Sequence, residues 1–359
     1  HEASHHLCIV PVLCATHAPV IGVELEFGEG VTTVQKTNAT SLERVFTQLL
    51  NFQLKEDSIQ INLEDWNNSP YHPVPTIIEA AELLYAGHNV HEIAHAATDS
   101  GNLAKTTDQI IKIIEDSQLN NKRSICFITG IPGSGKTLIG LNTIHDPRFR
   151  VEGRSSGAYL SGNTPLVNVL REALAKDETR RTNKSIGQTR QTVRTEIQLL
   201  MNYLKEYITE HPDRPPHENV IVFDEAQRAW DEDYGREKFN REASEAALFL
   251  EIMGRKEKWS VIIALVAGGQ EINKGEKGLS EWGKALINFG DTGLNKPWEV
   301  YGAPQIFYGS QETAGQKLFP SDIYKGQIHK EQLLHLSVSV RSYKCEAVAR
   351  WVNFVIDGD

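Results

Sequence analysis

The sequence predicts an α/β fold with a mostly parallel, doubly wound sheet, and three observations support that prediction. Short runs rich in β-branched residues recur along the chain, helical segments separate them, and a glycine-rich loop joins one such run to a helix. Strands that alternate with helices usually form a parallel sheet covered on both faces. The expected strands of this sheet are residues 124–129, 158–160, 219–223, 261–267 and 305–308.

The first 65 residues predict a small additional α/β segment. Strand-like runs at residues 9–15 and 20–27 precede an amphipathic segment at residues 42–52, and a proline-rich turn then breaks the pattern. The chain starts without methionine, so we interpret it as a piece of a longer protein. We expect three parts, namely this segment (1–65) as the tail of an upstream domain, a helical connector (66–101) and the main domain (102–359).

The composition is that of an ordinary soluble globular protein. It has 40% hydrophobic and 23% charged residues, and no apolar run approaches the ~20 residues that a membrane span needs. The cysteines show neither zinc-ligand spacing nor a small disulfide framework. We therefore expect a cytoplasmic protein with no membrane partner. The four scattered cysteines are Cys8, Cys14, Cys126 and Cys345.

The charge of the chain bears on nucleic-acid binding. A formal net charge of -10 argues against a uniformly basic binding surface but is compatible with a local basic groove. Basic residues gather in one stretch, which either lines such a groove or forms a solvated helical face with a basic loop. They are Arg171, Lys176, Arg180, Arg181, Lys184, Arg190 and Arg194.

A phosphate-binding loop is predicted between the strand that ends at Thr129 and a helix over residues 136–144, where the sequence fits G-x-x-x-x-G-K-[ST]. Glycines let successive backbone N–H groups and the positive end of the helix converge on phosphates. In this pattern Lys136 neutralises the β and γ phosphates, and the Thr137 hydroxyl binds magnesium. The loop residues are Gly130, Ile131, Pro132, Gly133, Ser134, Gly135, Lys136 and Thr137.

Two carboxylates follow the apolar run 220–223 directly. A buried parallel strand delivers such side chains at its carboxyl end, where ligands bind in open α/β sheets. Hydrolysis of a nucleotide needs an acid that holds magnesium and a group that orients the attacking water. We assign Asp224 to the magnesium and Glu225 to the role of catalytic base; a solvated turn is the alternative for such a pair where no phosphate loop is present.

Two further polar residues follow predicted strands. Gln270 comes just after residues 261–267 and either senses the γ-phosphate or belongs to a simple loop. Arg341 follows the strand-like run that begins at Leu336 and either acts as an arginine finger or forms a surface salt bridge.

Together these motifs resemble superfamily 1 helicases, in particular the bacterial helicase-like P-loop proteins related to the Schlafen helicase-like domain. The phosphate loop, the box 224–227, residues 268–270 and residues 340–342 follow the order of motifs I, II, III and IV. The resemblance covers residues 66–359 and implies a RecA-like ATPase domain that uses ATP and Mg²⁺. It also implies that the domain acts on DNA or RNA, preferably single-stranded, in a protein of phage-defence type.

The same resemblance assigns further residues. Residues 161–166 are similar to motif Ia, which contacts the nucleic-acid strand, and Gln109 resembles the glutamine that reads adenine; a surface or packing glutamine is its alternative. The family often carries an upstream nuclease domain, but Glu24 and Glu26 lack the expected nearby lysine, so we predict no nuclease activity here. Gly269 stands where motif III normally has Asp, and motifs V and VI do not follow Arg341.

The leading hypothesis is therefore an ATP-driven motor domain that works with a second motor domain or a protein partner. A nucleotide-dependent molecular switch acting on a protein is the alternative, favoured by the acidic balance. A nucleoside kinase is disfavoured by the box at residues 224–227. The GTPase motif Asn-Lys-x-Asp is absent from the sequence, so we expect ATP rather than GTP.

Overall fold

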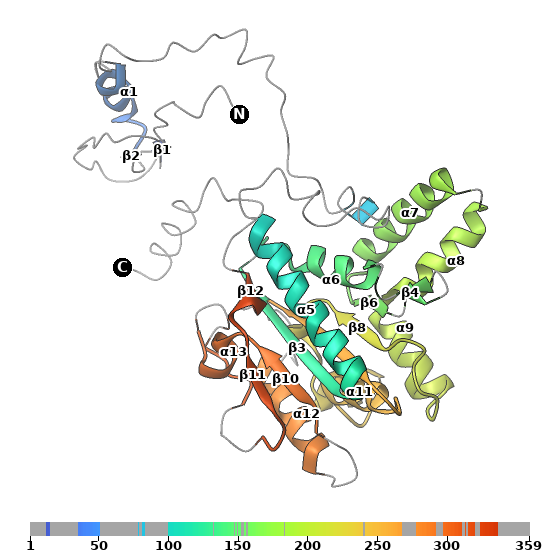
Figure 1. Cartoon of the computed structure of the whole chain (residues 1–359). Coiled ribbons are helices and arrows are strands. Elements are labelled where there is room, and N and C mark those ends of the chain that lie inside the picture. The colour runs from blue at the N-terminus through green and yellow to red at the C-terminus, as the bar shows by residue number, and fades with distance from the viewer. Residues whose placement is uncertain are drawn as a thin grey trace. The chain divides into compact units, whose positions relative to one another are not determined.

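Figure 1 shows a computed structural model of the chain, which is described here by parts. The structure describes residues 12–14, 35–50, 78, 81–82 and 100–336, with gaps at residues 132, 147, 149, 152–153, 156, 183, 240, 268–277, 292–296, 311–312, 314 and 320–323. Contacts between residues divide the chain into two compact units, residues 1–73 with 345–359, and residues 74–344. The predicted boundaries after residues 65 and 101 stay a prediction.

The larger unit is built on a sheet in which eight strands are described. Their order is β11-β10-β3-β9-β8-β6-β7, and β12 pairs with the end of β3. Every described pair in this sheet is parallel. The strands are β3 (Arg123–Gly130), β6 (Gly157–Ser161), β7 (Ile197–Leu199), β8 (Val220–Phe223), β9 (Ser260–Val266), β10 (Glu299–Gly302), β11 (Ile328–Lys330) and β12 (His335–Leu336).

Helices cover both faces of this sheet (Figure 1). Those of the larger unit are α5 (Ser100–Asn120), α6 (Lys136–His145), α7 (Thr164–Arg181), α8 (Ile186–Glu196), α9 (Leu200–Lys205), α10 (Glu232–Phe239), α11 (Glu245–Gly254), α12 (Leu279–Asp291) and α13 (Pro304–Tyr308). Short helical turns lie at Glu206–Glu210, Ala226–Arg228 and Gln332–Leu334, and a small antiparallel pair, β4 (Arg150–Val151) and β5 (Arg154–Ser155), lies apart from the sheet.

The two faces carry separate cores because side chains alternate along each strand. On one face Cys126, Ile128 and Val222 pack under α5, α6, α7 and α8. On the other face Phe127 and Phe223 pack with helices that include α11 and α12. The described side chains of β8 and β9 are all buried, as expected for central strands of a parallel sheet. The predicted α/β class with a parallel, doubly wound sheet is confirmed.

One predicted strand is wrong. Residues 305–308 belong to the short helix α13, because Ala303 is extended and Pro304 occupies the first helical turn, where its fixed φ suits a helix and its missing N–H costs nothing. The strand of this region is β10, a few residues earlier, which pairs with β3. A short apolar run alone does not distinguish a strand from a buried helical turn.

The smaller unit contains the predicted N-terminal α/β segment. Its strands β1 (Val12–Cys14) and β2 (Gln35–Thr37) pair in parallel, and α1 (Leu42–Leu50) follows. The predicted strand at residues 20–27, with Glu24 and Glu26, lies outside the described residues. Among the helices that the structure describes, none has the length and apolarity required to cross a membrane.

Candidate nucleotide-binding site

The glycine loop, residues 130–137, leaves the carboxyl end of β3 and enters α6 directly. Gly133 and Gly135 have φ angles of 78° and 92°, a left-handed conformation that side chains disfavour. Gly135 is the N-cap of α6 and offers no side-chain cap, whereas Asn163 caps α7 and Ser244 caps α11. The first backbone N–H groups of α6 therefore have no capping side chain, and such groups attract an anion.

The C-terminal strand β12 passes alongside the start of this loop. Ile131 N donates to Leu336 O at 3.2 Å, and Thr129 Oγ1 lies 2.9 Å from His335 Nδ1. A Cβ atom at Gly130 would lie 2.7 Å from Leu336 Cβ, so only glycine fits there. The glycine at this position thus permits β12 to pack on the loop.

Lys136 is folded back onto the loop. Its Nζ donates to Gly130 O at 2.7 Å and to Ile131 O at 3.0 Å. Burial lowers the pKa of Lys136, and the carboxylates of Glu225 and Asp224 oppose that shift. The Ser134 hydroxyl beside it is buried without a hydrogen-bond partner among the described residues. A half-buried lysine and an unpaired hydroxyl in one loop suit an anionic ligand.

Asp224 lies at the carboxyl end of β8, on the same edge of the sheet as the glycine loop. Its backbone N donates to Leu160 O at 2.9 Å, and Ser161 Oγ donates to its Oδ2 at 3.4 Å. Burial raises the pKa of Asp224 to about 6, while hydrogen bonds from neighbouring hydroxyls oppose that shift. Binding of a cation would compensate for burying this carboxylate.

The residues at this edge fit magnesium that arrives with a nucleotide. Mg²⁺ usually takes one or two protein oxygen ligands and completes its octahedral shell with phosphates and water. Asp224 and Thr137 supply one carboxylate and one hydroxyl. Within the described part of the chain no cluster of three metal-ligating side chains occurs, so the structure shows no self-sufficient metal site there.

Glu225 has an unusual backbone and a fixed side chain. Its φ and ψ are 55° and 46°, a strained left-handed conformation for a residue with a side chain. Gln227 Nε2 donates to Glu225 Oε2 at 2.5 Å, and Gln227 Oε1 accepts from Ala267 N at 2.9 Å. Since Ala267 follows β9, Gln227 ties the carboxylate after β8 to the end of the neighbouring strand.

Helix α12 contacts the turn that holds Glu225 and Gln227. Trp282 is fully buried, and its Nε1 donates to Ala226 O at 2.8 Å. Its ring also packs edge-on against Phe223, the last residue of β8. The strained turn is thus fixed by its hydrogen bonds and by a packed indole ring.

Several predicted site residues are not placed by the structure. Gln270, Arg341 and Pro132 lie outside the described residues, so the proposed roles of the first two stay predictions. Gln109 lies half-buried on α5, and Thr106, one turn earlier, donates to Leu333 O at 2.6 Å, near β12. The predicted adenine contact of Gln109 also stays a prediction.

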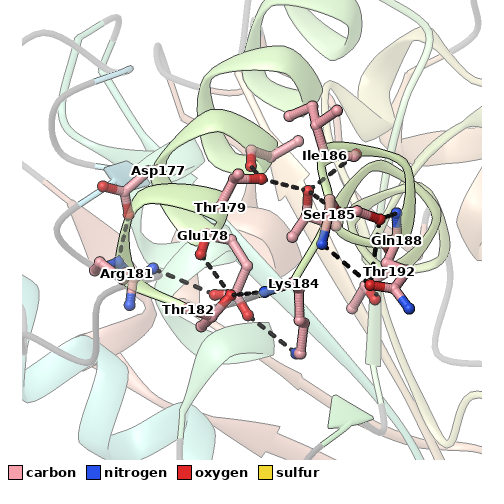
Figure 2. A network of polar contacts seen from close by, with 12 residues as sticks. Asp177, Glu178, Thr179, Arg181, Thr182, Lys184, Ser185, Ile186, Gln188 and Thr192 are labelled. Carbon is pink, nitrogen blue, oxygen red and sulfur yellow. Dashed lines mark hydrogen bonds and ion pairs between the residues drawn. The ribbon is translucent and has the colours of Figure 1, made fainter.

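The basic stretch at residues 171–194 forms the α7–α8 hairpin, and most of its charges are paired within it. Arg190 bonds Glu172 at 2.9 Å, Arg181 bonds Asp177 at 2.7 Å, and Lys184 bonds Glu178 at 3.2 Å. Figure 2 shows the tip of the hairpin, where Ser185 and Gln188 also cap each other at the start of α8. This pairing favours the solvated-face interpretation over a basic groove.

Comparison with known proteins shows the family. Residues 123–359 match the family described as Schlafen group 3, DNA/RNA helicase domain. The chain belongs to this family. A Schlafen group 3 domain is helicase-like, which agrees with the predicted Schlafen-related, helicase-like assignment.

Two further comparisons, with solved structures and with curated proteins, add no functional assignment. The crystal structure of the Pyrococcus furiosus Hef helicase domain is similar at 17% identity and a TM-score of 0.28, with 56% of this chain and 39% of that chain covered. The chain thus spans about two fifths of that structure. No curated protein matches the chain.

Reasoning from the sequence missed Tyr159, and it did not connect Ser161 of the motif Ia segment or Gln227 with the two carboxylates. Tyr159 lies on the predicted strand 158–160 and Ser161 directly follows that strand, so their spacing of two positions was a usable signal of a shared face. Gln227 was visible only as the last letter of the box at residues 224–227. No signal in the sequence connects it with Ala267, because that contact depends on the order of β8 and β9 in the sheet.

Proposed function

We propose that this domain binds ATP with Mg²⁺, hydrolyses it, and serves as the motor domain of a helicase-like protein that acts on DNA or RNA. The supporting observation is the meeting of two elements at one edge of a parallel sheet. One is a glycine loop that leads into an uncapped helix, and the other is the Asp224–Glu225 pair. Membership of a DNA/RNA helicase domain family supports the nucleic-acid partner.

In the bound state, Lys136 exchanges its two backbone carbonyl partners for the β and γ phosphates. The N–H groups at the start of α6 and the Ser134 hydroxyl hydrogen-bond the remaining phosphate oxygens. Thr137 and Asp224 hold Mg²⁺, which neutralises phosphate charge when bound.

For hydrolysis, Glu225 orients a water molecule and accepts its proton as the water oxygen attacks the γ-phosphorus and ADP leaves. Gln227 keeps the Glu225 carboxylate in place. We assign contacts with the γ-phosphate to Gln270 and Arg341 and a contact with adenine to Gln109, on the resemblance of their motifs alone.

The wider setting is part of the same proposal. Single-stranded DNA or RNA is the proposed track, and a second motor domain or a protein partner completes the machine. The scattered cysteines support a cytoplasmic location. A role in phage defence rests on the resemblance to bacterial helicase-like proteins.

A nucleotide-dependent switch that acts on a protein is the second candidate. The observations that favour it are the net charge of -10 and the α7–α8 hairpin, where basic side chains already have acidic partners. Phosphate contacts require accessible lysine and arginine side chains.

The test is steady-state ATP hydrolysis by the purified chain with Mg²⁺, measured with and without single-stranded DNA or RNA. The motor proposal predicts turnover that rises with nucleic acid and disappears in Lys136→Ala. Turnover that ignores nucleic acid would favour the switch. Nucleotide that neither binds nor turns over in the wild-type chain would contradict both.

A further inference from the structure

Tyr159 lies where the glycine-loop helix meets the sheet. It belongs to β6, pairs in register with Val222 of β8 and is fully buried. Its ring packs against α6 at Gly140, where a Cβ atom would lie 3.1 Å from Tyr159 Cε2. Glycine at this position therefore lets the ring fill the space between α6 and the sheet.

The hydroxyl of Tyr159 is buried beside the Asp224 carboxylate and the Thr137 hydroxyl, close enough to interact with both, although it forms no well-aligned hydrogen bond with any residue that the structure describes. Burial raises the pKa of Tyr159 well above its ordinary value, the Asp224 carboxylate raises it further, and the Thr137 hydroxyl opposes the shift. The strand register agrees with this placement, because Tyr159 pairs with Val222 and Asp224 stands two residues beyond Val222, on the same face of the sheet. A buried hydroxyl without a well-aligned hydrogen bond is costly, so its position beside Asp224 and Thr137 suggests a functional role.

Ser161, the next residue on the same face of β6, hydrogen-bonds the Asp224 carboxylate. Ser161 follows Tyr159 by two positions and donates to Asp224 Oδ2 at 3.4 Å. Strand β6 thus presents two hydroxyls toward one carboxylate.

We propose, on the basis of the proposed function, that Tyr159 is a positioning residue for the magnesium site. When Mg²⁺ and nucleotide are bound, its hydroxyl donates a hydrogen bond to the Asp224 carboxylate and holds it facing Thr137. Residues that orient a metal ligand in this way typically contribute about 10–100-fold to metal affinity.

The experiment compares Tyr159→Phe with wild type in binding a fluorescent ATP analogue while Mg²⁺ is titrated, and again in excess EDTA. We expect the half-saturating Mg²⁺ concentration to rise about tenfold. The affinity in EDTA should not change, because the phenol does not contact the nucleotide. The matched control is Tyr203→Phe, since Tyr203 is equally buried but its hydroxyl lies 3.6 Å from Met253 Sδ, in the core on the opposite face of the sheet.

Unfolding in denaturant without ligand gives a second readout. Because the Tyr159 hydroxyl makes no well-aligned hydrogen bond with the described residues, Tyr159→Phe should change the free energy of unfolding little, in contrast to its effect on Mg²⁺ binding. An unchanged Mg²⁺ requirement, or an equal loss of affinity with Mg²⁺ and with EDTA, would overturn the role of Tyr159 while leaving the proposed function intact. A wild-type chain that binds no nucleotide in either condition would overturn both.

Discussion

The glycine loop and the α7–α8 hairpin are both rich in polar side chains, but these side chains find different hydrogen-bond and ion-pair partners in the two regions. In the hairpin, lysines and arginines meet acidic partners on the same two helices (Figure 2). At the loop, Lys136 rests on backbone carbonyls, and the hydroxyl of Ser134 is buried without a partner among the described residues. Most basic side chains of the hairpin thus have acidic partners within it, whereas the loop holds a lysine and a buried hydroxyl that suit a ligand.

The largest expected effect comes from Glu225→Gln, which keeps the shape of the side chain and removes the base. We expect kcat for ATP hydrolysis to fall about 10²–10⁴-fold while nucleotide affinity is retained. Single-turnover hydrolysis and equilibrium binding measure the two quantities separately. Turnover at the wild-type rate in this variant would contradict the assignment of Glu225 as the catalytic base.

The next largest effect is expected for the pH dependence of stability at Glu245, whose ion pair is buried, unlike the exposed pairs of the hairpin. Its carboxylate pairs with Arg241 at 3.4 Å and accepts from Trp230 N at 3.2 Å. Burial raises the pKa of Glu245 from 4.5 to about 7. The folded chain therefore keeps a proton that the unfolded chain releases, and stability is lost as pH rises from about 4.5 to about 7.

Glu245→Gln keeps an oxygen acceptor for Trp230 N and cannot titrate. Between pH 5 and pH 8 the wild type should lose roughly 2–3 kcal/mol of unfolding free energy relative to this variant. Denaturant unfolding of both proteins across this pH range measures the difference. Identical pH dependence in the two proteins would show that Glu245 is ionised in the folded protein at both pH 5 and pH 8.

A smaller effect is expected from Gln227→Leu, which breaks the link between Glu225 and Ala267. The carboxylate loses its fixed orientation, so we expect kcat and kcat/KM to fall together by about tenfold with KM unchanged. Steady-state kinetics makes this distinction. A rise in KM with unchanged kcat would instead assign Gln227 to nucleotide binding.

The smallest effect belongs to the exposed Glu172–Arg190 pair of the hairpin. Its two side chains are 40% and 53% exposed, so solvent screens their attraction. A double-mutant cycle with Glu172→Ala and Arg190→Ala should give a coupling energy close to zero. A markedly larger value would indicate that the hairpin network is a structural element of the fold rather than a solvated surface.

The features that could be predicted from the sequence are local ones. The glycine loop and the two carboxylates each stand directly after an apolar run, so β3 and β8 and the side chains that follow them could be predicted from pattern alone. Residues 305–308 were misassigned because a proline at the first helical position outweighs a short apolar run.

What the sequence could not supply are contacts between distant segments. The placement of β12 beside Gly130, the bond from Ser161 to Asp224 and the link from Gln227 to Ala267 each depend on strand order. Strand order is set by how the whole sheet packs, and no short stretch of residues encodes it.

The most direct test of the central claim is the equilibrium affinity for ATP with Mg²⁺, measured by titration calorimetry on the wild type, Lys136→Ala and Lys184→Ala. Both changes remove a lysine, one from the glycine loop and one from a paired position on the hairpin. Binding by the wild type and by Lys184→Ala, with a loss of at least about 100-fold in Lys136→Ala, is the predicted result. Equal affinities in all three proteins would contradict a nucleotide site at the glycine loop.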